Sequence, residues 1–259
     1  MATIRGTKGP DKLKGTKDAD TILGLGADDT LFGNSGDDLI KGADGSDYLD
    51  GADGDDRMTG DAGGDKLFGR DGSDQLWGGD GLDVVGGGNG ADRLFGDDGN
   101  DLMAGDDGND RIEGGNDDDG ISGGDGNDTI LGGAGNDNID GSTGDDVING
   151  GGGRDVIFGA QGDDKLTGGG GGDTFMFLTA NTGRDQILDF NPGVDKVQIF
   201  KVGYGIPQGT TVHQLLVDYG TSKGGDSFLD LSLKGDDRPV IVFKGVKDVF
   251  DLEGSIILV

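Results

Sequence analysis

Apolar residues recur at every ninth position along the first two thirds of the chain. Nineteen consecutive nonapeptides, without insertion or deletion, fill residues 6–176, and the eighth position of every unit is apolar, from Leu13 to Phe175. Three residues centred on that position suffice for a short strand whose middle side chain points to one face. The pattern therefore predicts one short strand in each nonapeptide.

Glycine and aspartate occupy fixed places between the apolar positions. Position one is glycine and position six is aspartate in all nineteen units, and position four is glycine in sixteen. Because glycine supplies the positive backbone angles that turns demand, positions one to six are predicted to form a turn. Turn and strand, taken twice, close a coil of eighteen residues, and stacked coils bury position eight. The fold predicted for residues 1–176 is therefore all-β, a parallel β-roll (β-solenoid) of about 19 nonapeptide repeats.

The charge of the chain is concentrated in these repeats. The 259 residues carry 51 acidic and 21 basic side chains, for a net charge of −30. Residues 1–176 hold 40 acids and 13 bases, which gives −27 for the repeats alone. Phosphate binding needs clustered lysine and arginine, so nucleic acid is excluded as a predicted partner and cations are favoured. The absence of cysteine excludes disulfides and thiolate metal sites, and no apolar run is long enough to span a membrane.

The predicted roll has a thin core. One apolar side chain in nine residues buries little surface, whereas ordering a glycine-rich chain is costly in conformational entropy. Forty acidic side chains on a narrow rod also repel one another. The free chain is therefore predicted to be disordered or loosely compact until cations bind.

The aspartate at position six offers those cations a binding place. Stacked coils place each turn over the turn two repeats later, so these carboxylates form two files with neighbours about 5 Å apart. Ca²⁺ takes six to eight oxygens and accepts backbone carbonyls beside carboxylates, whereas Mg²⁺ prefers a small octahedron and keeps its waters. Nineteen turns leave at most 19 − 2 = 17 gaps, so up to about 17 Ca²⁺ ions are predicted. The alternative, an aspartate that only caps a tight turn, explains single copies but not all nineteen.

The units match a known repeat signature. Residues 78–85, 123–131 and 132–140 are good copies of the nonapeptide GGxGxDxUx. By this signature the chain resembles the RTX (repeat-in-toxin) family, the haemolysin-type calcium-binding proteins secreted by type I systems, as a short member without an enzyme domain. The resemblance implies that oxygens of positions one to four, together with the shared carboxylate of position six, bind Ca²⁺.

The resemblance is carried over to this chain unit by unit. The implied Ca²⁺ ligands are Asp29, Gly33, Gly36, Asp38, Gly42, Asp44, Gly45, Asp47, Gly51, Asp53, Gly54, Asp56, Gly60, Gly63, Asp65, Gly69, Asp71, Gly72, Asp74, Gly78, Gly79, Asp80, Gly81, Asp83, Gly87, Gly88, Asn89, Gly90, Asp92, Gly96, Asp98, Gly99, Asp101, Gly105, Asp107, Gly108, Asp110, Gly114, Asp119, Gly123, Gly124, Asp125, Gly126, Asp128, Gly132, Gly133, Gly135, Asp137, Gly141, Gly144, Asp146, Gly150, Gly151, Gly153, Asp155, Gly159, Gly162, Asp164, Gly168, Gly169, Gly171 and Asp173.

Two places depart from the pattern. Repeats one and two carry Lys8 and Lys17 in their turns and Asp18 at position four, so they are predicted to form a degenerate end cap. Repeat thirteen has Asp117 at position four, and Gly120 weakens its strand. Its Ca²⁺ site is predicted to be distorted or absent.

From Phe177 the nine-residue period stops, and residues 177–259 are predicted to form a small β-rich capping domain. Sequence patterns predict strands at 186–190, 196–200, 227–233 and 240–243, and residues 210–219 fit either a strand or a short helix.

The end of the chain carries a candidate export signal. Residues 183–197 look like the segment that follows the repeats in secreted RTX proteases. Residues 251–259, acidic and then apolar, are similar to the uncleaved C-terminal signal that type I export systems read. The alternative interpretation of 251–259 is a terminal core strand.

The sequence contains no catalytic motif. His213 is the sole histidine, which excludes the zinc sites of RTX proteases, and the Gly-x-Ser-x-Gly elbow of RTX lipases is absent. The chain is therefore predicted not to be an enzyme.

One outward strip is a candidate ligand site. Positions seven and nine flank the buried position eight, and on even-numbered repeats they carry aromatic and arginine side chains on successive coils. The strip consists of Arg57, Trp77, Arg93, Phe95 and Arg111. Such a strip suits a polysaccharide. The alternative is a lateral contact for the tail or for a partner chain.

These features predict a leaderless, secreted calcium-binding RTX protein of a Gram-negative bacterium. Sites of the extracellular kind have dissociation constants of roughly 0.1 to 1 mM, so the chain would stay unfolded in the cytosol and fold outside. Its predicted partners are Ca²⁺, the type I secretion machinery and a polysaccharide or the cell surface. Three rival functions stay open: a carbohydrate-binding module whose glycan binding Trp77→Ala abolishes, a membrane-active secreted effector, and the C-terminal part of a larger RTX enzyme.

Overall fold

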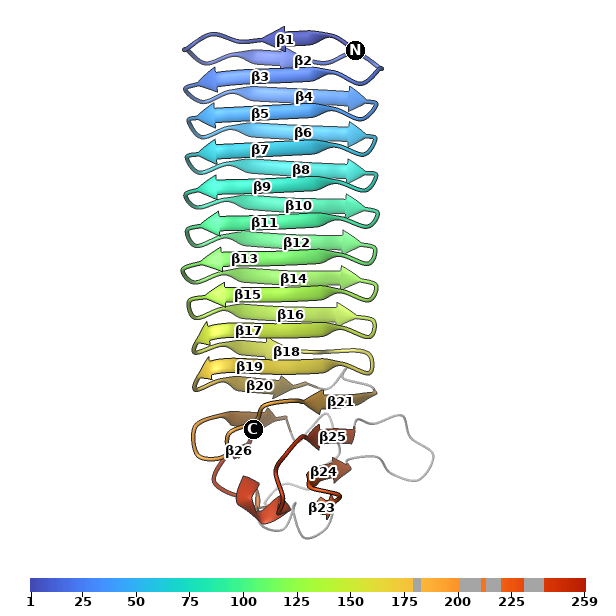
Figure 1. The fold of residues 1–259 in the computed structure, drawn as a ribbon, viewed down its shortest axis with the longest axis vertical. Helices are drawn as coiled ribbons and strands as arrows, with labels where there is room; N and C mark the ends of the chain where they lie inside the picture. Colours follow the sequence, from blue (N-terminus) through green and yellow to red (C-terminus); the bar gives the residue numbers. More distant parts are fainter. Residues whose placement is uncertain (179–182, 201–210, 213–219, 231–239) are drawn as a thin grey trace.

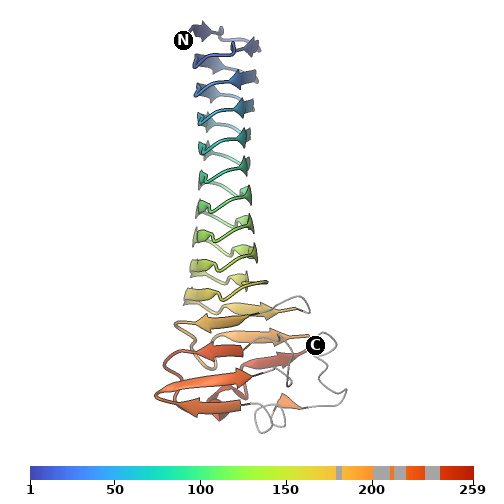
Figure 2. The same cartoon turned by 90° about the vertical axis from the view of Figure 1, so that its right-hand side faces the viewer.

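The chain winds into a flattened rod of stacked β-strands. The computed structural model describes residues 1–178, 183–200, 211–212, 220–230 and 240–259. Along the rod, odd-numbered strands form one sheet and even-numbered strands the other, with short turns between them (Figure 1). Seen edge-on, the two sheets face each other across a narrow interior (Figure 2).

The two sheets are named A and B. Sheet A contains, in spatial order, β1 (Thr3–Arg5), β3 (Thr21–Gly26), β5 (Leu39–Asp44), β7 (Arg57–Ala62), β9 (Gln75–Asp80), β11 (Arg93–Asp98), β13 (Arg111–Asn116), β15 (Thr129–Ala134), β17 (Val147–Gly153), β19 (Lys165–Gly171), β21 (Arg184–Ile187), β25 (Val240–Phe243), β24 (Asp226–Asp230) and β23 (Gly220–Lys223). Sheet B contains β2 (Lys12–Lys14), β4 (Thr30–Ser35), β6 (Tyr48–Asp53), β8 (Lys66–Asp71), β10 (Val84–Asn89), β12 (Leu102–Asp107), β14 (Gly120–Asp125), β16 (Asn138–Thr143), β18 (Val156–Phe158), β20 (Thr174–Phe177), β22 (Lys196–Ile199) and β26 (Ile256–Leu258). A 3₁₀-helix, η1 (Val249–Leu252), precedes β26.

The register of both sheets repeats every eighteen residues. Ile22 in β3 pairs with Ile40 in β5, and Ile40 pairs in turn with Met58 in β7, all in parallel ladders. The apolar residues of position eight therefore stack in two files that face each other inside the rod. From Ile22 to Phe175 none of them is more than 4% exposed. The predicted parallel β-solenoid, with its eighteen-residue coil and its buried position eight, is confirmed.

The strands are longer than the three residues that the sequence pattern predicts. A typical strand, β5, runs from position seven of one unit to position three of the next. The positive φ angles fall at positions two and four, as in Ala43 (φ 84°) and Gly45 (φ 137°), and not at position one. The predicted six-residue turn is therefore wrong, and the turn is only three residues long. The reason is strand alternation, which points positions eight and one to the same interior and lets the ladder continue past position nine.

Parallel stacking continues beyond the strict period. β21 pairs with β19 and β22 with β20, but the paired residues are 21 and 22 apart, as in Lys165 with Gln186 and Thr174 with Lys196. β25 then adds in parallel to β21, and β24 and β23 follow as antiparallel strands. The boundary predicted at residue 177 thus marks the end of the nine-residue period and not the end of the stacked sheets.

The strands expected in the tail are largely found. Residues 240–243 form β25, 196–200 contain β22, and 186–190 overlap β21. β24 covers the beginning of the strand predicted at 227–233; the remainder of that strand, and residues 213–219 with His213, lie outside the described residues. The terminal β26 pairs with β22, in line with the core-strand interpretation of the C-terminus. In the described part of the chain, no helix has the length and hydropathy needed to cross a membrane.

Candidate metal centre

The aspartates at position six form two continuous files along the turns of the rod. From Asp20 to Asp173 each is at most 3% exposed. From Asp29 on, the Oδ1 atom of each accepts the backbone N–H of the aspartate one coil earlier, as in Asp47 N to Asp65 Oδ1 at 2.7 Å and Asp92 N to Asp110 Oδ1 at 2.8 Å. Every turn is therefore fastened to the next by one carboxylate oxygen.

The other oxygen, Oδ2, is buried without a hydrogen bond in every unit from Asp29 to Asp164. Buried polar atoms are nearly always paired, and a buried charge without a partner is especially costly. A regular file of such atoms is therefore a candidate cation site.

A backbone carbonyl lies beside each of these oxygens. At Gly42, position one of its unit, an added Cβ would collide with Asp47 Oδ2 and would lie 3.0 Å from the carbonyl oxygen of Gly60 in the next coil. The same pair of oxygens meets Gly51, Gly60 and their counterparts along the rod. Position one must be glycine because the carboxylate and the carbonyl converge on the space that a side chain would fill.

The donor set fits Ca²⁺. Among the described residues, no group of three or more His, Cys, Asp or Glu side chains surrounds a common point, so the carbonyl oxygens beside each Oδ2 are the further ligands that the chain offers there. Ca²⁺ accepts carbonyl oxygens in flexible geometry, whereas Zn²⁺ prefers imidazole and thiolate ligands. Position-four glycines allow close carbonyl approach, because a Cβ on Gly45 would lie 2.6 Å from the carbonyl oxygen of Ala27.

Burial raises the pKa of the position-six carboxyls from Asp29 to Asp173. The pKa reaches about 7 for Asp56, Asp65, Asp110 and Asp119 and about 8 for Asp146. Desolvation is the largest cause, and repulsion from neighbouring aspartates adds to it. At neutral pH the files therefore resist carrying their full charge, and a divalent cation would favour the ionised form again.

The candidate ligands do not all lie in the files. Position one lies in the strand, where it faces Oδ2 of the position-six aspartate, whereas position four lies in the turn against the backbone of the preceding coil. The side chains of position three, such as Asp71 and Asp98, are exposed at the strand ends and accept hydrogen bonds from Asn89 and Asn116 of the next coil, both at 2.6 Å. Their side chains therefore line the outer surface of the rod, away from the buried oxygens.

Repeats one and two satisfy their aspartates without a metal. Thr16 donates its backbone N–H at 2.6 Å and its hydroxyl at 2.8 Å to Asp20 Oδ2, and Thr7 donates to Asp11 Oδ2 in the same way. The hydrogen bond from the Thr16 backbone, followed by that from Ala2, holds the pKa of Asp20 below its usual value. This gives a physical basis to the predicted end cap, because hydrogen-bond donors take the place of the cation.

Repeat thirteen keeps the geometry of its neighbours. Asp117 adopts φ +73°, which aspartate tolerates better than most residues. β14 retains its six residues, and Asp119 Oδ2 is buried as elsewhere in the file. The distorted or absent Ca²⁺ site predicted here stays a prediction, and the backbone of repeat thirteen gives no sign of it.

Three aspartates of the tail were not singled out from the sequence. Two of them continue the files of position-six aspartates, and the third caps the ladder. Asp185 Oδ1 accepts the Asp164 N–H at 3.2 Å, and Asp195 Oδ1 accepts the Asp173 N–H at 3.2 Å, as position-six residues do. The Gly-x-Asp-x-apolar motifs at 183–187 and 193–197 are the signal that could have found them. Asp189 accepts N–H groups of Gly168 and Gly169 and so caps the end of the regular ladder.

The outward strip is a stack of side chains on sheet A. The Trp77 ring lies parallel to the Phe95 ring, with centroids 5.2 Å apart and planes 7° apart. The Arg57 guanidinium lies 4.7 Å from the Trp77 centroid. Because β7 and β11 flank β9 on opposite sides, both faces of Trp77 are covered. Arg111 pairs with Glu113 at 2.6 Å, further along the same face.

The fold and the two files of buried aspartates together define the class of protein, which is a parallel β-roll with cation-binding turns. The profile of the RTX calcium-binding nonapeptide repeat (four copies) matches residues 3–31, 23–58, 50–85, 59–94, 86–121, 113–148, 122–157 and 140–175. The overlapping matches span residues 3–175, about two thirds of the chain, so the chain belongs to the RTX calcium-binding repeat family. No curated protein sequence matches it.

Two solved structures match this chain, one over part of its length and one over nearly all of it. The AlgE6R3 subunit of the Azotobacter vinelandii mannuronan C5-epimerase is 24% identical with a TM-score of 0.24, and the match covers 56% of this chain and 80% of that one. The extracellular lipase LipA of Serratia marcescens is 18% identical with a TM-score of 0.28. That match covers 98% of this chain but 40% of the lipase, so the chain spans less than half of the lipase's length.

Proposed function

We propose that this protein is a secreted calcium-binding protein whose roll folds when Ca²⁺ fills its turns, and that it acts outside the cell as a structural or interaction protein without catalytic activity. The file of buried Oδ2 atoms from Asp29 to Asp164, each beside a backbone carbonyl, carries the proposal. Membership of the RTX calcium-binding repeat family supports Ca²⁺ as the cation. Up to about 17 ions would fit between the stacked turns.

Bound Ca²⁺ supplies the positive charge that offsets the buried carboxylates of position six. The carboxylate of position six provides one oxygen to the ion and uses the other to hold the adjacent coil. Ten-fold saturation of a site adds about 1.4 kcal/mol to the folded state. Many linked sites therefore add to apolar burial and ladder hydrogen bonds in opposing the ordering entropy of the glycine-rich coils. Folding and binding should therefore occur in one cooperative transition.

The central experiment is a far-UV circular dichroism titration of the whole chain with Ca²⁺ and with Mg²⁺. In excess EDTA at neutral pH we expect a disordered spectrum, and Ca²⁺ should convert it to a β-rich spectrum. Mg²⁺ at the same concentrations should have little effect, because it keeps its waters and demands a small octahedron. A spectrum that is already β-rich in EDTA, and unchanged by Ca²⁺, would overturn the proposal.

Export through a type I system is the second part of the proposal. β26 is the last strand of sheet B in the folded chain, so an export machinery could read residues 251–259 only before folding. Removing 251–259 should abolish secretion from cells that express a type I exporter, whereas a secreted truncated chain would place the signal elsewhere. Intracellular solubility of the truncated chain, measured in parallel, separates loss of export from aggregation.

The polysaccharide interpretation of the strip receives less support. Sugars stack on open aromatic faces, and both faces of Trp77 are already covered, by Arg57 and by Phe95. The strip fits the alternative of a lateral protein contact better.

A further inference from the structure

At the same level along the rod, the outer face of sheet A carries a ridge and the outer face of sheet B carries a hollow. On sheet A the Arg57 guanidinium and the rings of Trp77 and Phe95 stack in that order and form a ridge. On sheet B the corresponding position nine is small in three successive strands, Gly86, Ala104 and Ser122. These small residues leave a hollow of about 550 Å³.

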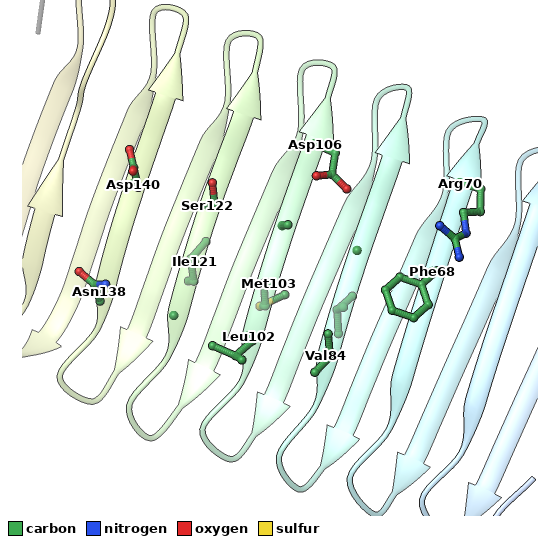
Figure 3. Close-up of a pocket in the computed structure, with 14 residues that line it drawn as sticks. Phe68, Arg70, Val84, Leu102, Met103, Asp106, Ile121, Ser122, Asn138 and Asp140 are labelled. Atoms are coloured by element: carbon green, nitrogen blue, oxygen red, sulfur yellow. The ribbon is translucent and has the colours of Figure 1, made fainter. Parts of the chain in front are cut away.

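The hollow has an apolar floor and charged margins. Figure 3 shows Phe68 and Arg70 of β8 at one end and Asp140 of β16 at the other. Leu102, which is 57% exposed, and Asp106 lie between those ends. An exposed leucine beside an apolar hollow on a highly charged rod indicates a surface that another molecule covers.

The ridge and the hollow coincide in position. β9 and β10 belong to one coil and β11 and β12 to the next, so the rings of Trp77 and Phe95 lie at the level of Gly86 and Ala104. Position nine is the third of six strand residues and therefore lies close to the middle of both faces. A second rod displaced sideways, without rotation, would place its ridge directly over the hollow.

The same displacement pairs opposite charges at two places, and it also brings Arg57, first in β7, toward Arg70 in β8, whose guanidinium is paired with Asp50. Strands of sheets A and B run in opposite directions (Figure 1), so the first residues of sheet A strands would meet the last residues of sheet B strands. Arg93, first in β11, would then face Asp106 in β12, and Asp61 near the end of β7 would face Lys66, first in β8. Within the described part of the chain, neither Arg93 nor Lys66 forms an ion pair.

We propose that the hollow of one copy receives the ridge of a second copy, so that folded rods stack side by side into an open-ended ribbon. The contact is heterologous, because each rod uses sheet A toward one neighbour and sheet B toward the other, and such contacts do not close. A face about 20 Å wide and about 43 Å long, along the nine coils from β3 to β20, buries roughly 860 Å² per partner, which matches a standard stable interface. The proposal rests on the proposed function, because Ca²⁺ must first fold the rods and neutralise their charge.

The test is sedimentation velocity of the whole chain in saturating Ca²⁺ over a range of protein concentrations. The native protein should form a concentration-dependent series of assemblies. Trp77→Ala, which removes the ridge, and Ala104→Trp, which fills the hollow, should each weaken association at least tenfold. An equimolar mixture of these two variants should form dimers and nothing larger, because one intact ridge meets one intact hollow and growth then stops.

Two controls make the outcome specific. Leu82→Ala removes a leucine that is 60% exposed in a turn, off both faces, and should leave association unchanged. Arg93→Glu and Asp106→Arg should each weaken association, and the double variant should recover it. The calcium titration by circular dichroism must be unchanged in every variant; a change there would bear on Ca²⁺-dependent folding and not on the contact.

Three results would overturn the proposal. Monomeric rods at every concentration would remove it outright. Weakening by Trp77→Ala but not by Ala104→Trp would indicate a ridge-to-ridge dimer. Equal weakening by Leu82→Ala would indicate nonspecific apolar association.

Discussion

Lowering the pH from about 8 to about 5 in excess EDTA should fold the metal-free chain into the β-roll. Burial raises the folded-state pKa to about 7 for Asp56, Asp65 and Asp110 and to about 8 for Asp146. In the unfolded chain the pKa of aspartate is about 3.9. Stability from a group with a raised folded pKa is fully present below the unfolded value and is lost as the pH rises through the folded value. Each raised pKa is worth on the order of 4 to 6 kcal/mol, so protonation of the carboxyls in both files removes a large electrostatic cost.

Circular dichroism against pH measures this effect. In EDTA the β-rich signal should appear with a midpoint between about pH 6 and pH 7, and the final pH of about 5 stays above the isoelectric point of about 4.1. With Ca²⁺ present the signal should persist at high pH, and the apparent Ca²⁺ affinity should fall below about pH 7 because protons compete for the carboxylates. A chain that stays unfolded in EDTA at pH 5, yet folds with Ca²⁺ at neutral pH, would show that the buried carboxylates are not the obstacle.

Gly87→Ala should interrupt the rod and lower both stability and calcium content. An added Cβ would lie 2.8 Å from the carbonyl oxygen of Gly105 and would collide with Asp92 Oδ2. Overpacking of this kind costs about 1 to 3 kcal/mol. Displacement of the carboxylate adds the loss of the Ca²⁺ that it helps to hold, so we expect a total of roughly 3 kcal/mol or more.

Gly152→Ala is the matched control, because its Cβ would meet nothing within 4 Å and it is exposed. Its effect should lie within about 0.5 kcal/mol of zero, as for most surface substitutions. The two variants are compared by the midpoint of the calcium titration and by the number of ions bound per chain in calorimetry. Equal effects of both substitutions would mean that the oxygens around position one accommodate an added Cβ, so that their packing does not require glycine there.

The sequence was a good guide to the fold, and less so to its details. The nine-residue period of the apolar position eight, from Leu13 to Phe175, predicted the coil, its two sheets and its core, because a strict repeat leaves one way to bury a single apolar side chain per unit. The length of the turn was misjudged. Glycine at position one suggested a positive φ, whereas it marks the close approach of oxygens such as Asp92 Oδ2 and the Gly105 carbonyl.

The tail is a second place where the sequence pattern did not predict the structure. Insertions changed the spacing to 21 and 22 residues, so the period disappeared from the sequence although the stacking of β21 and β22 continued. The Gly-x-Asp motifs around Asp185 and Asp195 survive, but two copies are too few to stand out against the background of 60 glycines in the chain.

By itself, the sequence determined the period, the charge, the identity of the core residues and the family, because each is a property of residue type and spacing. Only the tertiary structure decided which aspartate oxygen is left for a cation, that threonines replace the cation in the first coil, and that the ridge of Trp77 lies opposite the hollow beside Ala104. These features depend on residues eighteen apart, or on opposite faces of one coil, meeting in space, and distances of that kind are set by how the coils stack.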